Sequence, residues 1–193
     1  MHDKYTKLLT ATAADVRTVP EDAFVLCLND KGDVLKEYRS KQPLDPAAAS
    51  LRCYTVPLAP VTARICVTDA ITCTKPDGTT FKPGLCLNVR LRYISPSGLG
   101  TLLRKTGRMP DCLTIEDLYN QLSRDVRQIC ADAARKLTRE QTRSYQYWWQ
   151  DLKYGEVYRD MIFPPLMQLF SLHGFRLEKD DFSIAGVAPM PVR

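Results

Sequence analysis

Cysteine and histidine are the residue types in this chain best suited to covalent or metal chemistry. A Cys–His nucleophile would need His2 or His173 beside a cysteine, and zinc would need paired ligands at short spacing, yet no Cys-x-x-Cys pair occurs. His173 precedes Gly174, where histidine commonly caps helix carbonyls. We therefore expect no enzyme activity, no catalytic residue, no metal site and no cofactor.

The cysteines themselves are expected to be structural. Most of them lie inside apolar strand or helix patterns, which favours reduced, buried thiols in a reducing compartment. The seven are Cys27, Cys53, Cys66, Cys73, Cys86, Cys112 and Cys130.

Basic and aromatic side chains suggest an interaction surface instead. Arg124, Arg135 and Arg139 point away from the apolar stripe of a predicted helix. They form either a solvated face or a contact for anionic lipid headgroups or a neighbouring subunit. Tyr145, Trp148 and Trp149 share a second predicted helix face and form either a core anchor or an exposed patch. The candidate surface is Arg124, Arg135, Arg139, Tyr145, Trp148 and Trp149.

Composition limits the class of protein and the kinds of partner that the chain can have. The chain has 193 residues, 45% of them hydrophobic and 25% charged, which suits one globular domain, with or without an arm. Its net charge of +5 permits an anionic partner without requiring one, and acidic residues are scattered throughout. The sequence shows no signal peptide and no apolar run of the roughly 20 residues that span a bilayer. We expect a cytoplasmic location, including the cytoplasmic face of a membrane.

Two alternating segments form the predicted framework. Residues 61–74 and 85–95 each place apolar side chains on one face and polar side chains on the other, as strands of a half-buried sheet do. A Pro-Asp-Gly turn at 76–78 lies between them. Asp22–Leu28 and Asp33–Tyr38 predict a hairpin. Leu51–Pro57 predicts a strand near an edge or bend, because Pro57 and Pro60 follow.

Helices are predicted mainly in the second half. Thr114 is a plausible N-cap for a long amphipathic helix that extends to Leu137. Pro164-Pro165 is expected to interrupt the next helical region, and Leu166–His173 to form a short helix of its own. Phe175–Ile184 predicts a closing strand.

These elements predict an α+β fold, a mostly antiparallel curved sheet with helices packed on one face. Residues 1–22 are expected to be a short helix or loose arm, residues 23–187 the domain, and residues 188–193 a linker or tail, the proline-containing stretch from Gly186 leaving the domain.

This order of elements resembles the SPFH (band-7) domain of stomatin, prohibitin and flotillin. The resemblance is carried by Asp77-Gly78, the alternating Leu87–Tyr93 followed by Pro96, and the ending Leu166–His173, Gly174 and Phe175–Ala185. It implies a non-enzymatic scaffold that assembles side by side into oligomers or rings on a membrane and organises other proteins there. This chain departs from the family pattern in having neither the N-terminal membrane anchor nor the coiled coil after the domain. We therefore expect either a piece of a longer protein or a soluble variant.

Two other functions are weighed against the scaffold. Basic and aromatic residues interleave in Arg139–Trp149, as in segments that stack bases and contact phosphates, although the modest net charge disfavours nucleic acid. A soluble protein-interaction domain of a larger protein is the other alternative.

Overall fold

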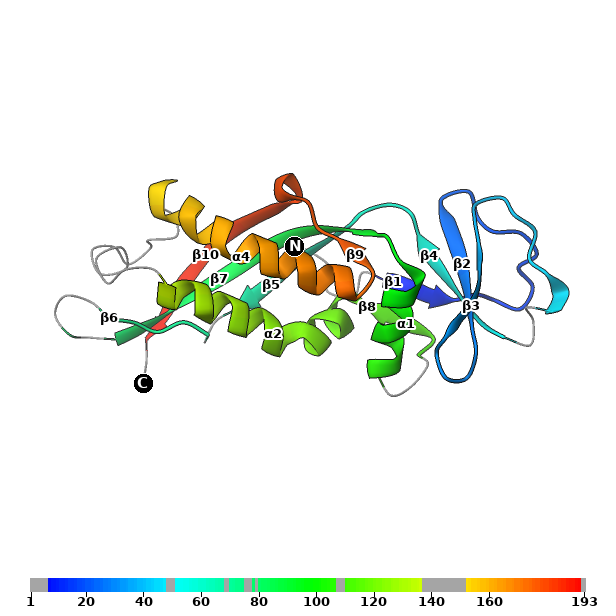
Figure 1. The fold of residues 1–193 in the computed structure, drawn as a ribbon, viewed down its shortest axis with the longest axis horizontal. Coiled ribbons are helices and arrows are strands. Elements are labelled where there is room, and N and C mark those ends of the chain that lie inside the picture. Colours follow the sequence, from blue (N-terminus) through cyan, green and yellow to red (C-terminus); the bar gives the residue numbers. More distant parts are fainter. Residues whose placement is uncertain are drawn as a thin grey trace. The chain divides into compact units, whose positions relative to one another are not determined.

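The fold is α+β, as predicted, and its paired strands are antiparallel. It is seen in a computed structural model (Figure 1) that describes residues 7–47, 51–67, 70–74, 78, 80–106, 110–136 and 152–191. The chain divides into two compact units, which we describe separately. The first comprises Met1–Val61, Leu91–Gln121 and Phe170–Arg176, and the second comprises Thr62–Arg90, Leu122–Leu169 and Leu177–Arg193.

The first unit is built on a sheet with the strand order β3-β2-β4-β1-β8. The predicted hairpin is confirmed, because β2 and β3 pair around the turn that contains Gly32. All six residues of β2 are buried, as expected for an inner strand covered on both faces. The strands are β1 (Lys7–Ala11), β2 (Ala23–Leu28), β3 (Val34–Tyr38), β4 (Arg52–Pro57) and β8 (Cys112–Thr114).

Two predictions for this sheet are wrong. Residues 1–22 were expected to form a short helix or loose arm, but Lys7–Ala11 is the inner strand β1, with Leu8 and Leu9 fully buried. The strand ending at Pro57 was expected near an edge or bend, but β4 lies between β2 and β1. Pro57 is the last residue of β4 and Pro60 lies beyond it, so neither proline interrupts the ladder.

The expectation that all cysteines are reduced is also wrong. Cys27 and Cys53 are joined by a disulfide. They lie directly opposite each other on the paired strands β2 and β4, and their Cα atoms are 4.1 Å apart. The sequence places each in a strand but does not show that these strands are neighbours.

Helix α1 (Pro96–Lys105) packs closely on the turn at Gly174 in the same unit. A Cβ added to Gly98 would lie 2.2 Å from the backbone nitrogen of Gly174, so neither backbone leaves room for a side chain. Ser95 caps the helix by accepting a hydrogen bond from the Gly98 N–H. The short strand β9 (Phe175–Arg176) then pairs with Arg92 and Tyr93.

The second unit has a sheet with the strand order β10-β7-β5, and β6 also pairs with β7. The predicted alternation is confirmed over β5, where Ala63, Ile65 and Val67 are buried and the residues between them are exposed. The prediction of one long strand over residues 61–74 is wrong, because β5 ends at Val67 and Cys73–Thr74 is a separate strand that pairs with β7. The alternating apolar residues of β7 from Leu85 to Leu91 are buried as well. The strands are β5 (Val61–Val67), β6 (Cys73–Thr74), β7 (Thr80–Tyr93) and β10 (Phe182–Pro191).

Helix α2 (Ile115–Lys136) confirms the predicted long amphipathic helix. Its buried stripe contains Leu122, Val126, Cys130 and Ala133 in the second unit. At its start the Thr114 N–H and hydroxyl both donate to the Asp117 carboxylate, and the Asp117 N–H donates to the Thr114 hydroxyl, so the predicted cap is confirmed.

Helix α4 (Leu152–Leu172) corrects the predicted break at Pro164-Pro165, because it continues through both prolines. Each proline removes one helical N–H donor. The buried stripe Tyr158, Ile162, Leu166 and Phe170 supports the helix on both sides of them. Figure 1 shows α2 and α4 lying over one face of the β10-β7-β5 sheet.

The closing strand also differs from the prediction. A 3-10 turn (Lys179–Asp181) separates β9 from β10, and β10 continues through residues 186–191, which were expected to be a linker. Pro191 pairs with Phe81 near the start of β7, which also begins earlier than expected. Because β10 is an outer strand, its prolines need no partner for the missing N–H groups.

None of the helices in the described part of the chain is long and apolar enough to cross a membrane.

Candidate functional site

The predicted interaction surface is only partly described. Arg124 and Arg135 are exposed on α2, and Arg135 forms an ion pair with Asp132. Eleven residues correspond to about three helical turns, so the two arginines lie on the same side of α2. Four members of the surface, Arg139, Tyr145, Trp148 and Trp149, lie outside the described residues, as does Arg139–Trp149 as a whole. The structure therefore describes two of the six residues and places them on one side of α2, about three turns apart.

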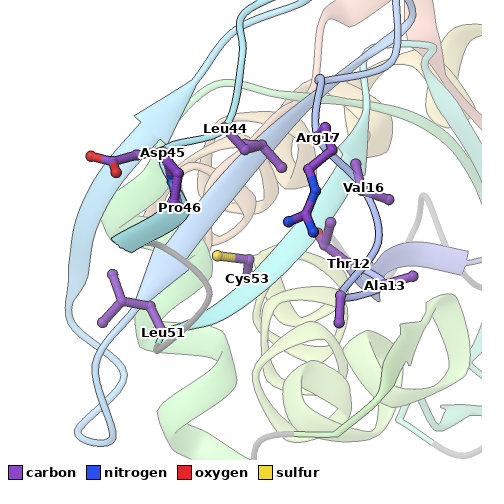
Figure 2. Close-up of a pocket in the computed structure, with 10 residues that line it drawn as sticks. Thr12, Ala13, Val16, Arg17, Leu44, Asp45, Pro46, Leu51 and Cys53 are labelled. Carbon is purple, nitrogen blue, oxygen red and sulfur yellow. The ribbon is translucent and has the colours of Figure 1, made fainter.

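A small pocket in the first unit was not predicted (Figure 2). Its volume is about 130 Å³, well below the roughly 300–1,000 Å³ of pockets for drug-sized ligands. It contains one of the two disulfide cysteines, Cys53, together with one basic and one acidic side chain. The lining residues are Thr12, Ala13, Ala14, Val16, Arg17, Leu44, Asp45, Pro46, Leu51 and Cys53.

Backbone hydrogen bonds fix two walls of this pocket. The Leu44 N–H donates to the Arg17 carbonyl at 2.9 Å, and the Val19 N–H donates to the Gln42 carbonyl at 2.9 Å. The two segments that carry Arg17 and Leu44 are therefore held side by side. Beneath them, a buried cluster that includes Cys27 and Tyr38 packs against Leu44, Leu51 and Cys53.

The two charged side chains of the pocket differ in their partners. The Asp45 carboxylate accepts a hydrogen bond from the Ala47 N–H at 2.9 Å and lies 3.3 Å from the Lys36 ammonium. Both contacts lower the pKa of Asp45, and the hydrogen bond from Ala47 contributes more than the contact with Lys36. Arg17 forms no ion pair with any residue that the structure describes. Its guanidinium extends to the side of the pocket where Cys53 lies (Figure 2).

A thiol cluster lies on the polar face of the sheet in the second unit. Cys66 on β5 is exposed, whereas Cys86 on β7 is buried, and Arg64 accompanies them. The pKa of Cys66 is raised to about 11, mainly because the sulfur is partly shielded from water and secondly because Cys86 lies beside it. Neighbouring Arg64 lowers this pKa by less. The Cys66 thiolate is therefore scarce at neutral pH.

His173 is one of the two histidines that could form a catalytic Cys–His pair. It is buried in the first unit, and its Nε2 atom lies 2.9 Å from Nζ of Lys105. An ammonium group only donates, so Nε2 is the acceptor when Lys105 is charged. Within the described ranges, no group of three or more His, Cys, Asp or Glu side chains is arranged to hold a metal ion.

No protein-family model matches the chain, and no curated protein is significantly similar to it. The resemblance to the SPFH domain therefore stays a prediction from sequence pattern.

Proposed function

We propose that this chain is a non-enzymatic scaffold domain that self-associates through an open sheet edge, the outer side of β5. The observation that carries the proposal is the position of β5 at the end of the β10-β7-β5 order, with no further strand beside it among the residues that the structure describes. An outer strand presents unpaired backbone N–H and C=O groups, which can pair with a strand from another molecule.

The other outer strands carry features that oppose such pairing. Strand β3 exposes Lys36 and Glu37, β8 has only three residues, and β10 contains two prolines near its end. Charge, short length and proline are the usual ways in which proteins protect a sheet edge. By contrast, β5 has seven residues, no proline and a single charged side chain, Arg64.

The charge of Arg64 also bears on the geometry of assembly. A symmetric antiparallel pair of β5 strands centred on Arg64 would place two arginines opposite each other, which is unfavourable. An antiparallel pair of β5 strands centred on another residue keeps the two arginines apart, so we favour a β5–β5 pair with such a register. A contact between the same edge of two copies has two-fold symmetry and closes as a dimer.

Sedimentation velocity over a range of concentrations tests self-association. The wild-type chain should form species larger than the 21.9 kDa monomer. Thr62→Lys adds a charge to an exposed position of β5 and should weaken association at least about tenfold. Ser183→Lys adds the same charge to an exposed position of β10 and should have no such effect. A monomer at every concentration would contradict the proposal.

We also propose that the assembled domain contacts anionic lipid at the cytoplasmic face of a membrane and organises partner proteins there. Arg124 and Arg135 support this, since they are exposed on one side of α2. Each basic side chain near an anionic surface contributes about 1 kcal/mol. Flotation with anionic vesicles should be weaker for the Arg124→Gln/Arg135→Gln/Arg139→Gln variant than for the wild-type chain. Equal flotation of the two proteins removes this part of the proposal.

The Cys27–Cys53 disulfide is the observation that counts most against the cytoplasmic location, because stable disulfides are rare in reducing compartments. Alkylation of thiols at the moment of cell lysis distinguishes a protein in a reducing compartment, with free thiols, from one in an oxidising compartment, with the disulfide. Unmodified Cys27 and Cys53 in that experiment would favour an oxidising compartment.

A further inference from the structure

We propose that the pocket of the first unit is a thiol-exchange site, where a small thiol that carries carboxylates attacks the Cys27–Cys53 disulfide and becomes attached to Cys53. The site consists of the disulfide, the pocket and Arg17. The inference does not depend on self-association.

Access determines which sulfur is attacked. Cys27 is fully buried within a cluster that contains Val25 and Tyr38. Cys53 is half-buried and lines the pocket. Exchange requires the thiolate to reach one sulfur of the bond. The pocket therefore directs attack to Cys53 Sγ, and Cys27 becomes the leaving group.

Size and charge determine which thiol fits. A volume of about 130 Å³ admits the sulfur end of a small thiol and leaves the rest of that molecule at the open side. Arg17 is exposed there, whereas Asp45 already has the Lys36 ammonium and the Ala47 N–H as partners. The uncompensated charge is therefore positive, which favours a thiol that carries carboxylates.

The chemistry needs no further reagent. The attacking thiolate forms a new S–S bond with Cys53, and the bond between Cys53 and Cys27 breaks, so that Cys27 leaves as a thiolate and takes a proton from water. Because Cys27 is buried, its thiolate is a poor leaving group. The reaction is therefore slow. It reverses when Cys27 attacks the mixed disulfide and expels the small thiol as its thiolate.

The test uses the full chain with glutathione as the anionic thiol and 2-mercaptoethanol as the neutral thiol. The reaction is stopped with acid, and peptide mass spectrometry follows the modified cysteine. Arg17→Gln is the test variant. Arg39→Gln is the matched control, because Arg39 is also an exposed arginine of the first unit but does not line the pocket.

We expect glutathione on Cys53. Arg17→Gln should slow its attachment about 1.5- to fivefold, the range expected for one exposed charge pair, and should leave the rate with 2-mercaptoethanol unchanged. Arg39→Gln should change neither rate. The proposal is overturned if Cys27 and Cys53 are free thiols in the purified protein. It is also overturned if glutathione attaches elsewhere, or if the two variants give the same ratio of rates.

Discussion

The two sheets of this protein handle their edges in opposite ways. In the first unit, the inner strand β2 is buried along its whole length, and the outer strands are charged or short. In the second unit, β5 is an outer strand with alternating buried and exposed residues and little to block its edge. Among the described strands, β5 is therefore the outer strand with the least protected edge, and the proposed self-association depends on this difference.

Each sheet also contains one pair of neighbouring cysteines. Cys27 and Cys53 in the first sheet are oxidised, whereas Cys66 and Cys86 in the second are thiols. In the first pair the half-buried sulfur faces a pocket, and in the second the thiol of Cys66 is stabilised in its protonated form. Cysteines on neighbouring strands therefore form a covalent cross-link in one sheet and remain thiols in the other.

Glycine substitutions should give the largest difference between the units. Gly98→Ala would place a Cβ 2.2 Å from the Gly174 nitrogen, so backbone must move, and we expect a loss of at least about 3 kcal/mol. Gly78→Ala in the second unit meets no atom within 4 Å and has only the strain of φ +84°, which costs about 1–2 kcal/mol. Denaturant unfolding measures both. Equal losses would contradict the close packing at Gly98.

Removal of the cysteine pairs should give the next largest difference. Cys27→Ala/Cys53→Ala opens a cross-link between residues 26 positions apart and should lower the free energy of unfolding by about 3 kcal/mol. Cys66→Ser changes an exposed thiol and should cost less than about 0.5 kcal/mol. Urea denaturation without reductant provides the comparison, and a double variant as stable as the wild-type chain would show that the disulfide is absent or ineffective.

Tyrosine hydroxyls should show a smaller effect. In the second unit the buried Tyr158 hydroxyl donates to the Cys130 carbonyl at 2.9 Å. In the first unit the hydroxyl of the fully buried Tyr54 donates to the carbonyl of the half-buried Pro110 at 3.0 Å. Tyr158→Phe should cost about 1 kcal/mol. Tyr54→Phe should cost less, since water can reach the carbonyl of the half-buried Pro110 once the hydroxyl is removed. Thermal unfolding ranks the two variants, and the reverse order would be unexpected on this basis.

The Cys66 thiol should change reactivity with pH without affecting stability near neutral pH. Its pKa is raised to about 11, so the thiolate forms only in strongly alkaline solution. The rate of Cys66 alkylation by iodoacetamide should therefore rise about tenfold for each pH unit from 7 to 10. A plateau at or below pH 9 would show that Cys66 is not shielded by Cys86 and burial.

Local patterns made much of the fold predictable. The alternation in Val61–Val67, the cap at Thr114 and the stripe along α2 depend on neighbours in sequence, and all three are confirmed. The predictions were wrong where pairing with segments distant in sequence decides the secondary structure. Lys7–Ala11 has no strong strand pattern and becomes a strand because β4 and β8 flank it. Residues 186–191 are extended because they pair with the start of β7.

The pocket could not be predicted for the same reason. Its residues come from three separate stretches of sequence, and only the pairing of β2 with β4 brings Cys27 opposite Cys53. A cysteine within each of two predicted strands was the available signal. Spacing along the chain does not reveal strand order.

Hydrogen–deuterium exchange at low and high protein concentration tests the central claim, that β5 is an assembly edge, most directly. We predict that amides of Val61–Val67 become more protected as concentration rises, while those of the charged edge strand β3 (Val34–Tyr38) do not change. Exchange in β5 that is independent of concentration would contradict the claim.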